Sequence, residues 1–499
     1  MNSKKGRGML RRSDAKSRSY KIILTASEMS PYAKTGGLAD VAGSLPKALS
    51  GLGNVDVRTF IPRYKIIDDD KYGLTEVPGA IQVSMGGRTH EIKVKCVELT
   101  ERWKAYFIDS EEYFGRDHLY GYEDDAQRFA FFARAVLEAS KALNFKPDVI
   151  HCNDWHTGLL PVYLKTLYSS DPFFKDTATV FTVHNLGYQG IFPKEILPTL
   201  DLGWEEFKPE KLEFWDKVNF IKGGLMYSDV INTVSRQYSK EIQTPWYGES
   251  LDGVLSYRRD VVYGILNGLD YDVWNPATDQ AIAQNYDASS IENKVKNKLA
   301  LQNENNMTED PEVPLIGVVS RLTYQKGLDI VADAIHDMLH LGAQIVLLGT
   351  GDEHYQERFR RIAYDFPSSV GINLTFSDPM ARRIYAGSDM FLMPSRYEPC
   401  GLGQLISMRY GTIPIVRKTG GLADTVQEYD PDTGDGTGFC FHDEWPSALM
   451  SAVRKALETY SNKNNWGKLI LNAMKADFSW ANSAREYVDL YRKAIQSRE

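Results

Sequence analysis

The sequence predicts an α/β protein made of two doubly wound parallel sheets. Short continuous apolar runs alternate with helical segments along most of the chain, the pattern of strands buried on both faces. In addition, the segment K-T-G-G-L-A-D occurs twice, at Lys34–Asp40 and at Lys418–Asp424, each time between a strand-like run and a helix-like segment. A chain of 499 residues exceeds what one core usually supports, so two domains or more are expected.

The first half of the chain supplies one complete set of these elements. A buried strand at 21–26 is followed by the first glycine turn and a helix that ends near Gly51. The alternating segment 79–108 indicates inserted hairpins. Further strands are expected at 55–61, 148–152, 177–183 and 230–234, and further helices at 125–143 and 212–227.

The strand–helix alternation then restarts. Strands are expected at 261–266, 313–320, 344–348, 370–376, 389–393 and 412–416, and a last helix at 481–497. We therefore predict a basic tail at 1–19, a first domain at 20–260, a second at 261–477 and a C-terminal helical segment at 478–499.

Composition narrows the class of protein. The net charge is −8, yet residues 1–19 hold seven Lys or Arg and one Asp, so the tail is basic and the body acidic, which disfavours nucleic-acid binding. The tail is interpreted as a disordered leader, with a targeting segment or a nucleic-acid arm as alternatives. No apolar run is long enough to span a bilayer, and the four dispersed cysteines fit a cytosol-like compartment.

Polar residues follow several predicted strands of the first half. Asn153-Asp154-Trp155-His156 comes after one strand and His184-Asn185 after another. In open α/β sheets, ligands collect outside the carboxyl ends of the strands. The glycines of Lys34–Asp40 let a backbone approach a ligand, and the helix that follows exposes unpaired N–H groups suited to phosphate or sugar oxygens. Ordinary βα turns and an N-cap role for Asp154 are the alternative interpretations.

Two loops of the second half carry charged residues at strand ends. Ser320–Gly327 contains Arg321 and Lys326, which can converge on the same phosphates. Pro394–Gly403 contains Glu398, a carboxylate placed to bind sugar hydroxyls or, alternatively, to cap a surface helix.

Other chemistries lack their motifs. Gly349-Thr350-Gly351 lacks the third glycine of a dinucleotide fingerprint, and the chain contains neither G-x-x-x-x-G-K-[ST] nor G-x-S-x-G. Its nine histidines form no H-E-x-x-H, so no metal site or cofactor is predicted.

Taken in order along the chain, six segments resemble the motifs of bacterial glycogen synthases and plant starch synthases. They are Lys34–Leu38, Asn153–His156, Thr182–Asn185, Leu266–Asp270, Ser320–Gly327 and Glu398–Leu402. The resemblance runs from about residue 20 to 490. It implies the GT-B type of fold, with two Rossmann-like domains facing across a cleft, the first on the acceptor side and the second for the nucleotide-sugar donor, and a last helix that crosses back to the first domain. It also implies retaining transfer of glucose from ADP-glucose to the non-reducing end of an α-1,4-glucan such as glycogen or starch, in the cytoplasm, or in the plastid stroma of a plant or alga.

The resemblance also implies roles for particular residues. Lys34, Gly36 and Gly37 would bind the donor's diphosphate and sugar, supported by Asp40, while Arg321 and Lys326 neutralise the departing diphosphate. His184 would contact the glucosyl group and Glu398 would hold its hydroxyls. The other substrate-binding candidates are Asp154, Asn185, Asn267, Cys400, Gly401, Leu402 and Phe376, the last at the position where an aromatic ring stacks on adenine.

One position departs from a pattern common among related sugar-nucleotide transferases, because Ile406 stands where a second glutamate would follow Glu398. A second carboxylate is therefore not assumed. Three alternatives remain open: a UDP-sugar-dependent glycosyltransferase, a phosphorylase, and a non-catalytic glucan- or nucleotide-binding protein on the same fold.

Overall fold

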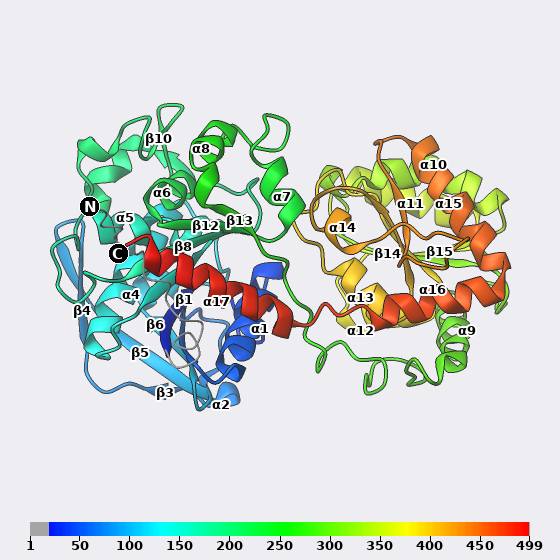
Figure 1. Cartoon of the computed structure of the whole chain (residues 1–499), viewed down its shortest axis with the longest axis horizontal. Coiled ribbons are helices and arrows are strands. Elements are labelled where there is room, and N and C mark those ends of the chain that lie inside the picture. Colours follow the sequence, from blue (N-terminus) through cyan, green and yellow to red (C-terminus); the bar gives the residue numbers. More distant parts are fainter. Residues whose placement is uncertain (1–18, 499) are drawn as a thin grey trace, which may run out of the picture. The chain divides into compact units, whose positions relative to one another are not determined.

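The structure of the chain is a computed structural model that describes residues 19–498. The chain folds into two compact units (Figure 1). Unit 1 contains the chain up to Asn232, the short segment Val254–Val262 and the C-terminal segment from Ala484. Unit 2 contains Thr233–Gly253 and Tyr263–Ser483. The basic tail predicted at 1–19 lies, apart from Ser19, outside the described residues. The predicted domain boundaries stay predictions.

The sheet of unit 1 has its topological switch point between β1 (Tyr20–Thr25) and β7 (Val149–Asn153). The strand order is β13-β12-β8-β7-β1-β2-β6-β5-β3, and β4 pairs with β5. Strand β1 pairs in parallel with β2 on one side and with β7 on the other, so the chain winds outward in both directions from this pair. The loops after β1 and β7 are therefore placed where a doubly wound sheet binds its ligand.

The elements between residues 19 and 264 have the following bounds. The other strands are β2 (Val55–Pro62), β3 (Thr75–Glu76), β4 (Ile81–Met85), β5 (Arg88–Thr100), β6 (Trp103–Asp109), β8 (Ala178–Val183), β9 (Ile191–Pro193), β10 (Glu213–Phe214), β11 (Lys217–Asn219), β12 (Val230–Thr233) and β13 (Val262–Gly264). The helices are α1 (Gly37–Gly51), α2 (Asp69–Tyr72), α3 (Glu111–Phe114), α4 (Asp125–Ala142), α5 (Leu159–Lys165), α6 (Phe220–Tyr227), α7 (Arg236–Glu241) and α8 (Asp252–Tyr257).

The sheet of unit 2 switches direction between β14 (Leu315–Val319) and β17 (Met390–Met393). Its order is β16-β15-β14-β17-β18-β19. Numbered from its own first strand, that order is 3-2-1-4-5-6, and all the pairings are parallel. This is the order of dinucleotide-binding folds, whose ligands lie at the carboxyl ends of the first and fourth strands.

The elements from residue 265 to the C-terminus have the following bounds. The other strands are β15 (Gln344–Leu348), β16 (Val370–Asn373), β18 (Ile413–Arg417) and β19 (Phe439–Phe441). The helices are α9 (Lys294–Glu304), α10 (Leu328–His340), α11 (Glu353–Asp365), α12 (Asp378–Gly387), α13 (Gly403–Arg409), α14 (Gly420–Thr425), α15 (Pro446–Ser461), α16 (Lys463–Lys475) and α17 (Trp480–Gln496).

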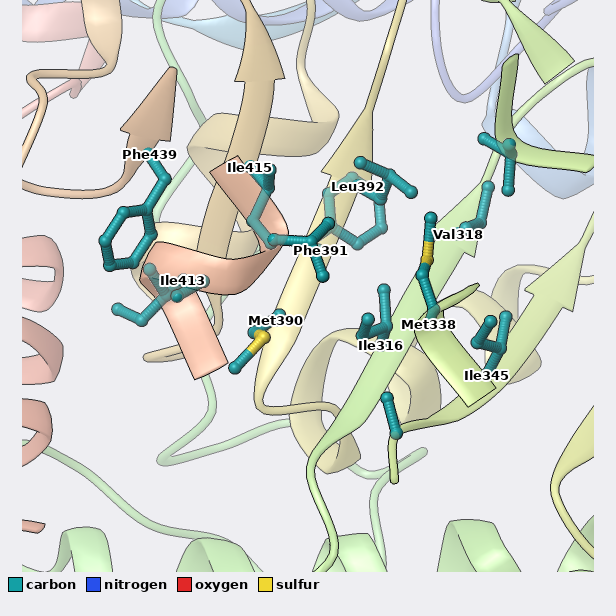
Figure 2. Packing of buried hydrophobic residues seen from close by; sticks show 14 of the residues in the cluster. Ile316, Val318, Met338, Ile345, Met390, Phe391, Leu392, Ile413, Ile415 and Phe439 are labelled. Atoms are coloured by element: carbon teal, nitrogen blue, oxygen red, sulfur yellow. The ribbon is translucent and has the colours of Figure 1, made fainter. Parts of the chain in front are cut away.

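The core of unit 2 is formed by buried side chains of adjacent strands and of the helices that pack against them (Figure 2). Ile316 and Val318 alternate along β14, as Ile413 and Ile415 do along β18, and all four are fully or almost fully buried. Burying such side chains contributes roughly 1.5–3 kcal/mol each. The sheet thus fixes the positions at which its carboxyl-end loops begin.

The prediction of one helix is wrong for the first half of its range. The helix expected at 212–227 begins only at Phe220, because 213–219 form the antiparallel hairpin of β10 and β11. Trp215 and Asp216 at its tip both have positive φ, the conformation that a two-residue hairpin turn requires.

The last helix, α17, belongs to unit 1 from Ala484 onward, whereas its first turn, up to Ser483, belongs to unit 2. Its Tyr491 hydroxyl is 3.0 Å from His151 Nδ1 on β7, and Asn232 Nδ2 on β12 donates to its Tyr487 hydroxyl at 3.2 Å. None of the helices between residues 19 and 498 combines the length and the apolar character that a membrane crossing requires.

Candidate functional site

Two loops surround a cavity of about 210 Å³ at the switch point of unit 2. One loop runs from the end of β14 through Ser320–Gly327 into α10, and the other from the end of β17 through Pro394–Leu402 into α13. Because β14 and β17 are neighbouring parallel strands, both loops leave the same edge of the sheet. The polar residues that line the cavity are Ser320, Arg321, Lys326, Ser395 and Glu398.

Lys326 and Glu398 form an ion pair in this cavity. Lys326 Nζ donates to Glu398 Oε2 at 2.6 Å, and the side chains are only 17% and 8% exposed. Ser395 Oγ donates to the same oxygen at 2.9 Å. Within the described part of the chain both bonds go to Oε2, which leaves Oε1 to accept from a ligand hydroxyl. An ammonium group has three donors, so Lys326 can keep Glu398 and still bind an anion.

The two loops are fastened to each other by Arg396. Its guanidinium donates to both carboxylate oxygens of Asp329 on α10, at 2.8 and 2.6 Å, and lies 3.8 Å from the ring centroid of Tyr324. This bidentate pair lowers the pKa of the Asp329 carboxyl. Arg321 also lines the cavity and is exposed, so the cavity has one cation at its surface and another, Lys326, inside.

The remaining substrate-binding candidates of the second loop differ in whether they line the cavity or are buried outside its lining. Gly401 and Leu402 line the cavity, and Gly401 has a φ of +73°, which glycine adopts without strain. Cys400 is buried, its thiol accepts a hydrogen bond from the backbone N–H of Asn267, and burial raises its pKa to about 12. Asn267 Oδ1 is buried and has no hydrogen-bond partner among residues 19–498, so the amide can accept a hydrogen bond from a ligand.

Phe376 stands apart from the cavity lining. The strand expected at 370–376 ends at Asn373, so Phe376 lies in the loop between β16 and α12. Its ring is 86% exposed, a large apolar surface open to an aromatic partner.

In unit 1, the first glycine turn is held by a buried carboxylate that our sequence analysis missed. Glu28 Oε2 accepts from Thr35 Oγ1 at 3.0 Å and from Gly36 N at 3.1 Å. A Cβ atom on Gly37 would meet no atom within 4 Å, so this face of the turn is open to a ligand. Lys34 Nζ donates to Asp40 Oδ1 at 2.6 Å. Asp40 therefore supports the lysine side chain that we expect to bind the donor.

Asp154 and His184 lie together at the carboxyl ends of β7 and β8. Asp154 Oδ1 accepts from the backbone N of His184 at 2.7 Å. Burial raises the pKa of Asp154 to about 7, because its hydrogen bonds from the backbone of His184 and Asn185 only partly offset the loss of water. The Asn185 side chain itself accepts from the backbone N–H of Gly187 at 3.0 Å.

Asn153 fixes the proton on His184. Its amide nitrogen donates to Thr25 O at 3.0 Å, so its oxygen faces His184 Nε2 at 2.8 Å. An amide oxygen can only accept, which places the proton on Nε2 and makes Nδ1 an acceptor. Burial lowers the pKa of His184 to about 3, so the ring is neutral at physiological pH and can accept from a sugar hydroxyl.

His156 has a structural environment. It is buried, stacks on Trp155 with ring centroids 3.9 Å apart, and lies edge-on to Phe129. Burial lowers its pKa well below the ordinary value.

Sequence reasoning assigned no role to three residues of the site, Glu28, Ser395 and Asn153, although Asn153 stands in the polar cluster that follows a predicted strand. Each lies within or beside a segment that we did identify, close to the end of a buried strand. Considering every polar side chain that follows a predicted strand would have added Glu28 and Ser395. Between residues 19 and 498 there is no group of three or more His, Cys, Asp or Glu placed to hold a metal ion.

Comparisons with known proteins show the family of the chain. Residues 21–257 match the family described as "Starch synthase catalytic domain", and residues 301–470 match "Glycosyl transferases group 1". The chain is 50% identical over 492 residues to a glycogen synthase of Desulforudis audaxviator, covering 96% of this chain and 97% of that protein. It is 47% identical over 481 residues to a glycogen synthase of Moorella thermoacetica, covering 96% and 97%.

Solved structures show the same relationship. The catalytic domain of starch synthase IV from Arabidopsis thaliana, bound to ADP and acarbose, has a TM-score of 0.89 and 35% identity, covering 96% of this chain and 100% of that one. Sucrose-phosphate synthase from Thermosynechococcus elongatus has a TM-score of 0.58 and 18% identity, covering 95% of this chain and 98% of that one, and shows the fold alone.

The chain is thus a glycosyltransferase of the GT-B fold, and the predicted fold class is confirmed. More specifically, it belongs to the glycogen and starch synthase family, as its motifs predict. It is a glucosyltransferase of glycogen or starch synthesis, which takes a nucleotide-sugar donor and a glucan acceptor.

Proposed function

We propose that the donor is ADP-glucose and that glucose is added, with retention of configuration, to the non-reducing end of an α-1,4-glucan. The observation that carries this proposal is the cavity at the unit 2 switch point, where Arg321 and Lys326 meet Glu398. The ADP-bound starch synthase IV, which resembles the chain over nearly its full length, supports adenine as the donor base.

The charges around the cavity match the donor. A sugar nucleotide carries a diphosphate, and as the glycosidic bond breaks the leaving phosphate gains negative charge. Arg321 supplies a planar guanidinium and Lys326 an ammonium, which stabilise that charge without rearranging during the reaction. These side chains provide the counter-charge themselves, so the proposal assigns no metal to the site.

Glu398 provides the complementary recognition of the sugar. Its carboxylate is held at Oε2 by Lys326 and Ser395, so Oε1 has a fixed direction. A fixed, partly desolvated carboxylate accepts strongly from sugar hydroxyls. The pair thus places a hydrogen-bond acceptor for the sugar hydroxyls beside a hydrogen-bond donor for the phosphate. The sugar and the phosphate flank the bond that breaks. Among the loop's other residues, Gly401 and Leu402 would form the wall beside the sugar, and Cys400 and Asn267 would support it.

The residues of unit 1 have proposed roles that come from the family resemblance. Lys34 and the open Gly36–Gly37 turn would bind the diphosphate and sugar, and His184 and Asp154 the glucosyl group. The neutral state of His184 supports this role, since a ring that accepts at Nδ1 suits a hydroxyl. Asn185 would complete this group, and the exposed ring of Phe376 in unit 2 would stack on adenine.

Retention without a second carboxylate near Glu398 is consistent with attack by the acceptor hydroxyl on the donor's own face, while the leaving phosphate takes the hydroxyl proton. In this step the bond from the anomeric carbon to phosphate oxygen breaks and the bond to the acceptor oxygen forms. ADP carries away the electron pair. Arg321 and Lys326 then hold the ADP product.

A donor competition assay tests the proposal. The chain is incubated with glycogen, excess EDTA and equal concentrations of radiolabelled ADP-glucose and unlabelled UDP-glucose, and then with the labels exchanged. We expect incorporation mainly from ADP-glucose. Preference for UDP-glucose, or release of glucose 1-phosphate from glycogen with inorganic phosphate, would assign the site to the alternative enzymes. Tight ADP binding without any incorporation would support the non-catalytic alternative.

The proposed place of action is the cytoplasm, or the plastid stroma in a plant or alga. Four free thiols, two of them buried, fit a reducing compartment. Immunodetection after cell fractionation tests this, and recovery from an oxidising compartment would contradict it.

A further inference from the structure

The second copy of the glycine turn is closed where the first is open. A Cβ atom on Gly420 would lie 2.0 Å from the carbonyl oxygen of Glu398, and one on Gly421 would lie 2.0 Å from that of Cys400. On Gly37, the residue of the first turn that corresponds to Gly421, a Cβ atom would meet nothing within 4 Å. The glycines at 420 and 421 therefore permit close approach to the protein's own backbone rather than to a ligand.

This second turn holds the main chain of the loop that carries Glu398. Gly421 N donates to Glu398 O at 3.0 Å. Farther along α14, Thr425 Oγ1 accepts at 3.2 Å from the buried Gln404 side chain, which also donates to Cys400 O at 3.0 Å. The Glu398–Cys400 backbone is thus fixed from α14 and from α13.

The second turn is held in turn by Glu241, the last residue of α7. Both carboxylate oxygens lie 3.1 Å from Gly420 N, and Oε2 lies 3.3 Å from Thr419 Oγ1. Glu241 is only 8% exposed. A second bond joins the same helices, since Gln237 N at the start of α7 donates to Asp424 Oδ2 at 2.9 Å. All of these residues belong to unit 2.

In both copies of the turn, a glutamate side chain accepts hydrogen bonds from the Thr-Gly pair. Glu28 binds the Thr-Gly pair of the first turn as Glu241 binds that of the second. Glu28 lies seven residues before its turn, whereas Glu241 lies nearly 180 residues before its own. Glu241 and its hydrogen-bond donors are buried, so losing the carboxylate would leave Gly420 N without its acceptor and would loosen the turn.

We propose that Glu241 is a positioning residue for catalysis: it fixes the second K-T-G-G-L-A-D turn, which fixes the backbone of Glu398. This inference rests on the proposed function of Glu398. Arg321 and Lys326 stand on the loop after β14, not on the loop that the second turn holds, so loss of Glu241 leaves both cations beside the diphosphate while the sugar-binding carboxylate, and with it the bond to Lys326, shifts. Misplacement of a reacting group by about 1 Å can lower a rate by about a hundredfold.

The test compares Glu241→Ala, Glu241→Gln and the control Lys240→Ala, which changes the exposed neighbour on the same helix. We expect Glu241→Ala to lower kcat by about 10- to 100-fold with the Kd for ADP within about twofold of the parent. The Gln variant keeps an oxygen acceptor for Gly420 N and should recover most of kcat. Lys240→Ala should match the parent.

A second readout needs no activity. Cys400 is buried in the supported loop, and Cys152 is buried in unit 1. Alkylation of the native protein with N-ethylmaleimide, followed by mass spectrometry, should label Cys400 about tenfold faster in Glu241→Ala, because the loop opens more often, with Cys152 unchanged. Unchanged Cys400 labelling, or a loss of ADP affinity that parallels a lowered Tm, would overturn the inference. An inactive parent protein would instead contradict the proposed function and leave the labelling result to decide on Glu241.

Discussion

A lysine and a glutamate 72 positions apart in sequence share one hydrogen bond at the centre of the proposed donor site. Lys326 reaches Glu398 because β14 and β17 are neighbours in the sheet, so the loops that follow them converge. The pair is mostly buried, and each partner keeps the other's charge compensated before the donor arrives.

Removing either charge tests the pair. Lys326→Gln and Glu398→Gln should each lower kcat by about a hundredfold or more, the scale seen when a group that stabilises the transition state is lost. Initial rates with saturating donor measure this. Lys468→Gln, at an exposed position on α16, is the control. Rates near that of the parent for either site variant would show that the chemistry is misplaced.

Asp154 gives a prediction for the pH dependence of stability. Its pKa of about 7 in the folded protein exceeds the ordinary value of 3.8, so the folded state binds a proton that the unfolded state releases. The contribution of Asp154 to stability is therefore present below about pH 4 and is lost as pH rises to about 7. Measured by urea unfolding, parent and Asp154→Asn should differ progressively in favour of Asn between pH 4.5 and 7.5. A difference that does not change with pH would contradict the assigned pKa.

At the scale of elements, the two identical turns differ in what surrounds them. The first follows β1 and leaves Gly37 open, whereas the second follows β18 and closes on Glu398 and Cys400. Identical sequence thus forms the same strand–turn–helix unit in both places, and the neighbouring residues determine whether the turn stays open or packs against the protein.

Replacing a glycine by alanine in each turn distinguishes the open turn from the packed one. Gly421→Ala should destabilise the protein by about 1–3 kcal/mol, because its Cβ atom overlaps the Cys400 carbonyl. Gly37→Ala should change stability by less than about 1 kcal/mol, and in the stabilising direction, since alanine favours a helix. Thermal unfolding measures both. Equal effects at the two positions would show that their surroundings are alike.

The last helix gives a further prediction at this scale. Tyr491→Phe leaves the buried His151 Nδ1 without its partner, which should cost about 1–3 kcal/mol. Tyr257→Phe, at a residue 78% exposed, is the matched control and should have no effect. A Tyr491→Phe chain that unfolds at the same urea concentration as the parent would mean that the His151 contact does not stabilise unit 1.

Local sequence was sufficient to place candidate residues at the ends of strands, and their roles stay predictions. Lys326, Glu398 and His184 could be singled out because each stands just after a buried strand. Glu28 and Glu241 could not be matched to their turns, since that depends on which segments approach in three dimensions. The helix expected at 212–227 failed because the apolar spacing there also fits a hairpin, and two residues with positive φ, Trp215 and Asp216, decide for the hairpin.

At the scale of the whole molecule, two doubly wound sheets each present ligand-binding loops at their own switch points. Unit 2 has the strand order of a nucleotide-binding fold and the cations that suit a diphosphate. Unit 1 has a neutral histidine, a carboxyl group with a raised pKa and an open glycine turn, which suit hydroxyl-rich ligands. Groups suited to a diphosphate together with groups suited to sugar hydroxyls fit a transferase that takes a nucleotide-sugar donor and a glucan acceptor.

The most direct test of the account is to determine where transferred glucose is placed in the product. Glycogen is incubated with the chain and ADP-[¹⁴C]glucose in excess EDTA, purified, and digested with β-amylase, which releases maltose from non-reducing ends joined by α-1,4 linkages. The account predicts incorporation of label and its release as maltose. An unlabelled glucan, or label that β-amylase cannot release, would contradict it.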